Sequence, residues 1–311
     1  MPHAIWIVFF LAATSAFAGP RVEREFASWA HDEDMLPATY AFYSRDGVVL
    51  ETGGVGAAPD TALPIASISK TIAAQCVLHL IDDGQLALDN TLRDILHWSG
   101  PPGRITVAAL LTNASGLTAP DRDVDGGGLI AHPESPEKIA RLLHDISRRT
   151  HVGDPGIFHY NNENWLILEQ VVRRIVGRDA IDWCFDTLPA LARFNSLRRY
   201  DDLRAVGFAG GIAMSAPDLA RFFGALTYRD DWPKAAISHT AAYGPGVFIR
   251  DDEDGRWMYH TGAYCPDDGV NIGAIAAVLP NGISVAMIYT GCAEAHDIET
   301  LNALIARYLT R

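Results

Sequence analysis

The sequence has 311 residues, of which 49% are hydrophobic and 20% are charged, so it describes a globular chain with room for one large domain or two smaller ones. A formal net charge of −13 and the lack of clustered Lys and Arg argue against a nucleic-acid partner. No internal repeat or low-complexity segment occurs, which excludes solenoid architectures and long disordered tails.

The first residues predict an export signal. An apolar run at Ile5–Ala13 is followed by Ala16-Phe17-Ala18 and then Gly19-Pro20, which is the hydrophobic segment and small-residue cleavage pattern of a signal peptide. The run is too short to span a bilayer comfortably, and no later stretch is apolar enough to do so. Only the terminal amine and His3 supply positive charge before the run, so an uncleaved anchor or a buried N-terminal strand stays an alternative. We expect residues 1–18 to be a signal peptide and the mature chain to be periplasmic or secreted, with no stable membrane span.

The N-terminal part of the mature chain combines a short amphipathic helix, a hairpin and an apolar helix. The helix is predicted over residues 21–31, and an Asp46-Gly47 turn joins strands over 39–44 and 48–51. The apolar helix is predicted over 67–82, where an Asp-Gly pair ends it.

The middle of the chain is predicted to be helical. Apolar residues recur with the helical period between loops rich in Gly, Pro and Asp. The expected helices cover residues 105–112, 136–148, 162–176, 180–191 and 217–226.

The C-terminal part returns to the two-residue period of strands, with hairpins over 246–260 and 271–290 before a helix over 295–309. Strands near both ends of the chain imply an α+β fold in a single region, residues 19–311. We expect residues 19–70 and 240–311 to form an antiparallel sheet flanked by helices, and residues 71–239 to form an inserted, mostly helical part.

The four cysteines lack the C-x-x-C spacing of zinc ribbons and thioredoxin-like sites. Cys76 falls within the first apolar helix and is predicted to be a buried thiol. Cys265 and Cys292 flank the second hairpin and can pair in an oxidising compartment.

Ser67 and Lys70 stand one helical turn apart at the start of the apolar helix, so their side chains are expected on one face. The helix dipole and burial would depress the pKa of the lysine, and a neutral amine can take a proton from a serine hydroxyl. The S-x-x-K spacing also fits a solvated polar pair on any amphipathic helix. The functional interpretation therefore depends on the rest of the chain.

Tyr160 and Asn162 form a second candidate group, just before a predicted helix. A phenol whose pKa is lowered beside a lysine ammonium can accept the serine proton and return it to a leaving group. The Asn162 amide can hydrogen-bond a substrate carbonyl. Residues of these types are also common at helix starts with no catalytic role.

His260, Thr261 and Gly262 form the third group, at the end of a predicted strand. A glycine there lets a substrate backbone approach closely. The backbone amides of Ala263 and Ser67 can together form an oxyanion hole. Taken alone, the three residues also fit an ordinary strand end.

The order and context of these groups resemble the serine β-lactamase and penicillin-binding protein-like superfamily, and most closely class C β-lactamases with their esterase and D-aminopeptidase relatives. The likeness extends over nearly the whole mature chain, with further similar segments at residues 46–47, 65–74, 83–86, 110–117 and 210–212.

The resemblance implies a β-lactamase/transpeptidase-like fold and a role for each group. Ser67 would be the acylated nucleophile, and Lys70 and Tyr160 would share the proton transfers. Asn162 and the strand that carries His260 would hold the substrate.

Two positions depart from the pattern of the family. Penicillin-hydrolysing members usually carry Lys where this chain has His260, and a histidine is mostly neutral at pH 7. This favours relatives that act as esterases or on D-amino-acid peptides over an efficient β-lactamase. Asn113, where relatives often have His, is interpreted as structural.

We therefore expect an exported serine hydrolase that acts on an ester or amide, with a small molecule or a peptide as substrate. One alternative is a DD-peptidase or β-lactamase acting on acyl-D-Ala or β-lactam substrates, and another is an inactive binding protein of the same fold. The sequence leaves the oligomeric state open.

No cofactor or metal is expected. Asp121–Gly126 resembles the start of a calcium loop, but its twelfth position is His132 instead of a bidentate glutamate. His151 and His159 flank the Tyr160 loop, and we expect them mainly at the surface.

Overall fold

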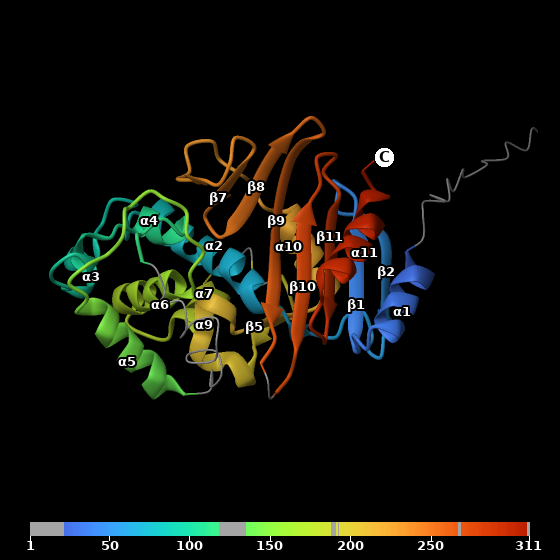
Figure 1. Cartoon of the computed structure of the whole chain (residues 1–311), viewed down its shortest axis with the longest axis horizontal. Coiled ribbons are helices and arrows are strands. Elements are labelled where there is room, and N and C mark those ends of the chain that lie inside the picture. The colour runs from blue at the N-terminus through green and yellow to red at the C-terminus, as the bar shows by residue number, and fades with distance from the viewer. Residues whose placement is uncertain (1–21, 118–134, 188–190, 192, 267–268, 310–311) are drawn as a thin grey trace, which may run out of the picture.

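The structure of the protein is a computed structural model, and it describes residues 22–117, 135–187, 191, 193–266 and 269–309. The expected signal peptide and the loop at Asp121–Gly126 lie outside the described residues. Figure 1 shows a large sheet on one side of the molecule and a group of helices on the other.

The secondary structure follows the predicted order, with additional short elements at residues 63–64, 102–104, 198–214 and 235–244. The helices are α1 (Glu23–Asp32), α2 (Ser69–Asp82), α3 (Leu92–Leu96), α4 (Val107–Leu111), α5 (Pro136–Ser147), α6 (Asn162–Val176), α7 (Ala180–Thr187), α9 (Gly207–Gly210), α10 (Ala216–Gly224) and α11 (Ala295–Ala306). Three 3₁₀ turns are η1 (Ala66–Ile68), η2 (Pro102–Arg104) and η3 (Asp201–Val206). The strands are β1 (Ala38–Tyr43), β2 (Val49–Val55), β3 (Leu63–Pro64), β4 (Arg198–Arg199), β5 (Ile212–Met214), β6 (Ala235–Ala236), β7 (Ala241–Gly244), β8 (Val247–Asp252), β9 (Gly255–Tyr264), β10 (Ile272–Val278) and β11 (Ser284–Tyr289).

The main sheet has eight antiparallel strands in the order β2-β1-β11-β10-β9-β8-β7-β6. The sheet joins the N-terminal and C-terminal parts of the chain, because β1 pairs with β11 and places Ala38 opposite Tyr289. The predicted antiparallel sheet built from both termini is therefore confirmed.

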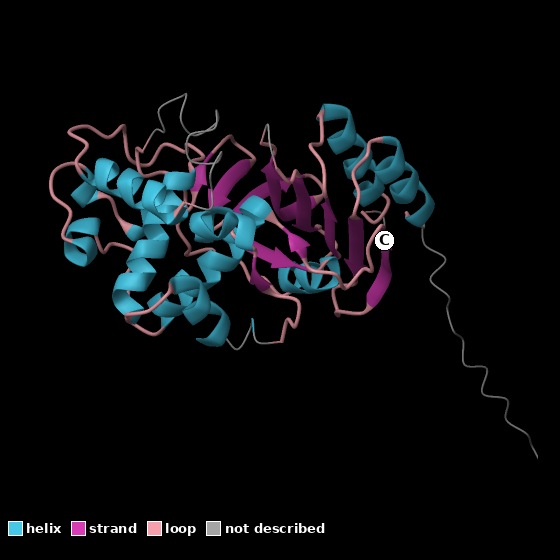
Figure 2. Cartoon of the chain, turned by 90° about the horizontal axis from the view of Figure 1, so that it is seen from below, coloured by secondary structure: helices cyan, strands magenta, loops and turns pink. Residues whose placement is uncertain are grey.

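Strands β1, β10 and β11 contribute to two hydrophobic cores because successive side chains point to opposite faces of a sheet. In β1, Tyr40 and Phe42 pack into the core that includes α1 and α11, whereas Ala41 packs into the core that includes α2, α6 and α10. The sheet is thus covered on both faces, as Figure 2 shows.

The helical group lies beside one end of the sheet, where α6 contacts α3, α4, α7 and α9 (Figure 1). Helix α6 spans the predicted residues 162–176, since the Asn161 side chain accepts a hydrogen bond from the Glu163 amide and caps its start. Gly177 ends the helix in the left-handed conformation, with φ of 72°.

A second, three-stranded sheet has the order β3-β5-β4 and supports the segment before Ser67. The Ile65 amide donates to the Ile212 carbonyl at 3.1 Å, and the Ile212 amide donates to the Ser69 hydroxyl at 3.1 Å. These bonds attach the start of α2 to β5. The short strands β3, β4 and β5 were not predicted from the sequence.

Two disulfides connect distant parts of the chain. Cys265 pairs with Cys292, which confirms the predicted possibility of a bridge across the second hairpin. Cys76 is buried as expected, but the prediction of a free thiol is wrong, because Cys76 pairs with Cys184. This bridge joins α2 to α7, and the packing of these two helices brings together cysteines 108 residues apart.

The helices within the described ranges are all too short or too polar to cross a membrane.

Candidate active site

Ser67 lies in the 3₁₀ turn η1, immediately before α2. The helix begins at Ser69 rather than near Ser67, and Ala66 has a positive φ of 42°, so the chain turns sharply just before the serine. Lys70 is in the first turn of α2, and its Nζ lies 2.9 Å from the Ser67 Oγ. The structure thus brings the predicted pair into direct contact.

Lys70 is fully buried, and its amine has a second partner. Nζ donates a hydrogen bond to the Ala209 carbonyl of α9 at 2.6 Å. Burial lowers the pKa of Lys70 well below its ordinary value, because an ammonium group loses its hydration there. In the neutral amine, one N–H can stay on Ala209 while the lone pair faces the serine hydroxyl.

Tyr160 lies in the loop before α6 and faces the same pair. Its side chain hydrogen-bonds Ser67, and the Lys70 Nζ is 5.2 Å from the centre of its ring. Although 36% of the residue is exposed, its hydroxyl end is inside the site. Burial raises the pKa of Tyr160, with the hydrogen bond from Ser67 acting in the opposite direction. The expected lowering of this pKa is therefore wrong, since desolvation dominates.

Asn113 holds the Tyr160 loop in place from the end of α4. Its carbonyl accepts from the His159 amide at 2.8 Å, and its Oδ1 accepts from the Asn164 Nδ2 at 2.9 Å. Asn113 has a left-handed backbone with φ of 51°, which asparagine tolerates better than most residues. These contacts agree with the structural interpretation of Asn113.

Asn162 is the first residue of α6. Its Oδ1 is buried and has no hydrogen-bond partner within the described part of the chain. An acceptor of this kind is costly to leave unpaired, so a donor from a substrate or a water would stabilise it.

Residues His260 to Ala263 continue β9 past the end of β8. β9 pairs with β8 only as far as Tyr259, which lies opposite Phe248, whereas it pairs with β10 as far as Tyr264. One edge of this segment therefore has no strand partner. Thr261 and Ala263 are exposed, while His260 and Gly262 are buried, as the alternation of a strand requires.

Gly262 packs directly on the segment that leads to Ser67. A Cβ atom at this position would collide with the Ile65 carbonyl, so only glycine allows β9 to approach η1 this closely. The sequence predicted a close approach by the substrate, whereas the structure shows a close approach by the chain itself.

His260 is 1% exposed and is held as a neutral imidazole. Nδ1 donates to the Thr261 carbonyl at 2.7 Å, which leaves Nε2 to accept from the Tyr243 hydroxyl at 3.2 Å. Burial lowers the pKa of His260 to about 3, and the charge of Lys70 acts in the same direction. The site therefore has no fixed cation at this position.

Sequence reasoning missed Tyr243, Phe248 and Ala209. The Tyr243 and Phe248 rings surround Tyr160 at centroid distances of 6.1 Å, and Ala209 contributes only its carbonyl. A backbone acceptor leaves no side-chain pattern in a sequence. His151 and His159 are exposed.

One group within the described residues has the composition of a metal site. Glu33, His296 and Asp297 bring their ligand atoms within 4.8 Å of one another, at α1 and α11. Asp297 already accepts from the Trp29 indole at 2.8 Å. The group is separate from Ser67.

The same fold occurs in solved structures of penicillin-binding protein homologues, amidases and β-lactamases. The octameric penicillin-binding protein homologue from Pyrococcus abyssi has a TM-score of 0.74 at 17% identity, over 91% of this chain and 76% of that chain. The D-amino acid amidase from Ochrobactrum anthropi has a TM-score of 0.72 at 16% identity, over 92% of this chain and 98% of that chain. A class C β-lactamase from Rhodobacter sphaeroides has a TM-score of 0.70 at 16% identity and the same coverages.

The sequence comparison assigns the family. The chain belongs to the Beta-lactamase family of serine hydrolases, whose model matches residues 30–309. A putative penicillin-binding protein of Bacillus subtilis is 24% identical over 146 residues, which are 44% of this chain and 35% of that protein. The match therefore spans about a third of the length of this curated relative.

Proposed function

We propose that the chain is an exported serine hydrolase that forms an acyl-enzyme at Ser67 with an ester or amide substrate and releases the acyl group to water. The observation that carries the proposal is the buried Lys70 amine, which lies 2.9 Å from the Ser67 Oγ and has a lowered pKa. A neutral amine at this distance is a general base within reach of the nucleophile.

Acylation follows from the positions of the three side chains. Lys70 takes the proton of Ser67 as Oγ attacks the substrate carbonyl, and the C–O or C–N bond to the leaving group breaks as the intermediate collapses. Tyr160, whose raised pKa keeps its phenol protonated, donates a proton to the leaving group and recovers one from the Lys70 ammonium. The same groups then activate water to hydrolyse the ester.

We propose the backbone amides of Ser67 and Ala263 as the oxyanion hole. Ser67 sits at the start of α2, where amides lack helical partners, and Ala263 lies on the part of β9 whose edge has no strand partner. An extended substrate could align along this edge. Asn162, whose buried Oδ1 has no partner among the described residues, would bind a substrate donor.

Because His260 is neutral, it offers no positive charge to a substrate carboxylate. This favours esters and amides that carry no obligatory carboxylate at that position. The second candidate is a DD-peptidase or β-lactamase, which the shared fold supports. An inactive binding protein is less well supported, because Ser67, Lys70 and Tyr160 are all in contact.

Export is supported by the two disulfides, since such bonds form and persist in oxidising compartments. N-terminal sequencing of the exported protein tests both cleavage after residue 18 and the uncleaved alternative.

Labelling with a fluorophosphonate followed by mass spectrometry tests the nucleophile. We expect one adduct on Ser67 in the wild type and none in Ser67→Ala. Ser69→Ala is the matched control, because Ser69 is buried two residues away and its hydroxyl contacts the Ile212 amide instead of Lys70. Equal labelling of wild type and Ser67→Ala would exclude Ser67 as nucleophile.

A substrate panel then ranks the two enzymatic candidates. The turnover rates of short p-nitrophenyl esters, nitrocefin and an acyl-D-Ala-D-Ala peptide are measured with the wild type. The rates with Ser67→Ala are subtracted as the background. Faster turnover of the esters supports the leading proposal, whereas faster turnover of nitrocefin or the peptide supports the alternative.

A further inference from the structure

A cavity of about 510 Å³ lies among α5, α6 and the segments around α3 and η3. Apolar side chains such as Leu96, Ile139 and Leu166 form part of its wall, and charged side chains form another part. Glu169 is the most buried of these charged residues, with 9% of its surface exposed. It projects from the middle of α6, and the mechanism above does not use it.

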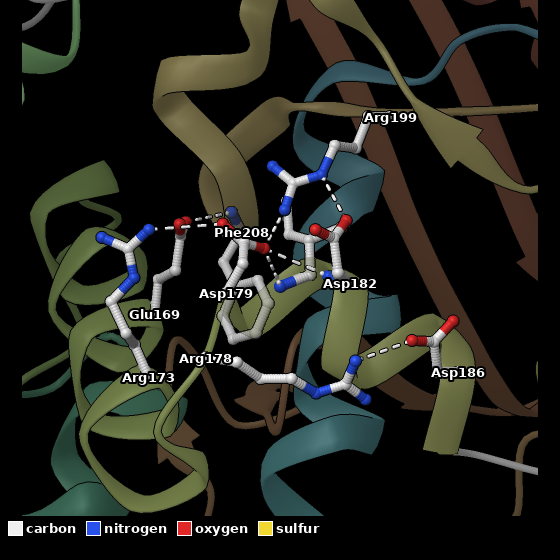
Figure 3. A network of polar contacts seen from close by, with 9 residues as sticks. Glu169, Arg173, Arg178, Asp179, Asp182, Asp186, Arg199 and Phe208 are labelled. Atoms are coloured by element: carbon white, nitrogen blue, oxygen red, sulfur yellow. Dashed lines mark hydrogen bonds and ion pairs between the residues drawn. The ribbon is translucent and has the colours of Figure 1, made fainter.

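Glu169 is bonded to the short helix α9. Its Oε2 accepts a hydrogen bond from the Phe208 amide at 2.9 Å, as Figure 3 shows. The Glu169 carboxylate also packs closely against the backbone of Gly207, because a Cβ atom on Gly207 would overlap it. Glu169 therefore supplies an acceptor to a backbone amide at the start of α9, where an intrahelical partner is lacking.

The next residue of α9 contacts the catalytic centre. The Phe208 amide points to Glu169, and the carbonyl of Ala209 accepts the hydrogen bond from the Lys70 Nζ at 2.6 Å. Gly207, Gly210 and Gly211 surround these two residues, so the backbone of α9 has little stiffness of its own. An external support has the greatest effect on such a segment.

We propose that Glu169 is a positioning residue for Lys70: its carboxyl group fixes α9, and α9 in turn holds the Ala209 carbonyl that orients the Lys70 amine toward Ser67. The inference rests on the proposed role of Lys70 as the base for Ser67.

The chemical reason lies in the geometry of a neutral amine, which has two N–H donors and one lone pair. When the Ala209 carbonyl fixes one N–H, the directions of the other N–H and of the lone pair are restricted, so that the lone pair of the neutral amine can face the Ser67 Oγ 2.9 Å away. If α9 shifts, the amine rotates and the proton transfer from Ser67 loses its alignment. A misplacement of about 1 Å in a catalytic group can cost on the order of a hundredfold in rate.

Three substitutions of Glu169 distinguish a positioning role from a general effect on the stability of the protein. Glu169→Ala removes the acceptor, and Glu169→Asp keeps the charge but is one methylene too short to reach Phe208. Both are expected to lower the acylation rate constant of Ser67 by about tenfold or more, with the substrate dissociation constant unchanged. Glu169→Gln keeps an acceptor oxygen at the same reach, and its rate is expected within about threefold of the wild type.

Asp179→Asn is the matched control within the same cavity. Asp179 pairs with Arg173 and Arg199 and lines the cavity, but no bond joins it to α9 (Figure 3). Its acylation rate is expected to match the wild type, since Asn keeps the oxygen that accepts the Ile181 amide.

The chain has only three lysines, Lys70, Lys138 and Lys234, which makes a direct spectroscopic test possible. In protein labelled with ¹³C at the lysine ε-carbon, the Lys70 signal is assigned by its absence in Lys70→Met. We expect this signal to change its chemical shift and titration midpoint in Glu169→Ala and Glu169→Asp, and to stay at the wild-type position in Glu169→Gln and Asp179→Asn.

The two readouts distinguish this inference from the proposed function. If no probe acylates Ser67 in the wild type, the proposed function fails, while the Lys70 signal still reports whether Glu169 positions the amine. A wild-type Lys70 signal and wild-type acylation rate in Glu169→Asp would overturn the positioning role. Equal losses in Glu169→Gln and Glu169→Asp would also overturn it, because the retained acceptor would then have no effect.

Discussion

Two titratable side chains at the site, Lys70 and His260, are both shifted toward their neutral forms by burial. The expected consequences differ, since Lys70 contacts Ser67, the proposed nucleophile, whereas His260 is bonded to Tyr243 and Thr261. We expect Lys70 to govern the pH dependence of acylation and His260 to govern part of the pH dependence of stability.

The acylation rate of Ser67 with an uncharged ester should depend on the protonation state of Lys70. Because the lowered pKa leaves the amine neutral, the rate should reach its plateau well below the ordinary lysine value of 10.5 and fall about tenfold per pH unit on the acid side. Stopped-flow measurements across the pH range test this. Lys70→Arg should lose the plateau, because a guanidinium stays protonated. A wild-type rate that rises only near the ordinary lysine pKa would contradict the assignment.

His260 should make the protein less stable in acid. Its pKa is about 3 in the folded state and 6.5 as the ordinary value, so between these values the unfolded state binds more protons. The contribution of His260 to the free energy of unfolding is then fully present above pH 6.5 and is lost as the pH falls toward 3. The loss between pH 7 and pH 4 is on the order of 3 kcal/mol.

Urea unfolding of the wild type and His260→Gln at both pH values measures this contribution. Glutamine does not titrate, so the variant should lose about 3 kcal/mol less than the wild type over the same interval. Identical pH dependence of the two proteins would show that His260 is not held neutral in the folded state.

The contact between β9 and the segment that leads into η1 depends on Gly262 and on Ile65, the residue before η1. Gly262→Ala should push β9 away from the Ile65 carbonyl, at a cost of about 1–3 kcal/mol in unfolding free energy, and should also slow acylation of Ser67. Thermal unfolding and acylation kinetics measure the two effects.

Gly84→Ala is a suitable comparison for Gly262→Ala. Gly84 has a positive φ of 69° and no neighbouring atom within reach of an added Cβ, so it should lose about 1 kcal/mol of stability with an unchanged acylation rate. If Gly262→Ala acylates as fast as Gly84→Ala, the contact does not hold the serine in position.

Elements with local signals could be predicted from the sequence. Helix α6 was predicted over its observed range because Asn161 caps it and Gly177 ends it, and the turn between β1 and β2 followed from Asp46 and Gly47, whose φ is 76°. Helix α9 has only four residues, two of which are glycines that favour no regular structure, so its formation depends on tertiary contacts.

The candidate site likewise contains contacts that a local sequence pattern predicts and contacts that depend on tertiary structure. The Ser67 and Lys70 contact follows from helical spacing, and the sequence could predict it. The Ala209 carbonyl and the raised pKa of Tyr160 could not be predicted, because the first is a backbone group and the second depends on the depth of burial. The Cys76–Cys184 bridge depends on the packing of α2 against α7, which no local pattern specifies.

At the scale of the whole molecule, the disulfides should contribute unequally to stability. The Cys76–Cys184 bridge closes a loop of 108 residues and the Cys265–Cys292 bridge one of 27. The chain-entropy relation gives about 5 and about 3.5 kcal/mol for these lengths. The double variant Cys76→Ala/Cys184→Ala should therefore unfold at a lower temperature than Cys265→Ala/Cys292→Ala, by scanning calorimetry. The reverse order would show that local packing outweighs loop length.

The pairing of β1 with β11 constrains how the chain can be made. β1 lies between β2 and β11, so one of its edges stays unpaired until residues 284–289 have left the ribosome. The N-terminal hairpin therefore waits for β11, and the contacts between β1 and β11 have the greatest sequence separation in the main sheet. A chain with this topology can complete its main sheet only after β11 has been synthesised, so folding of the two terminal parts is coupled.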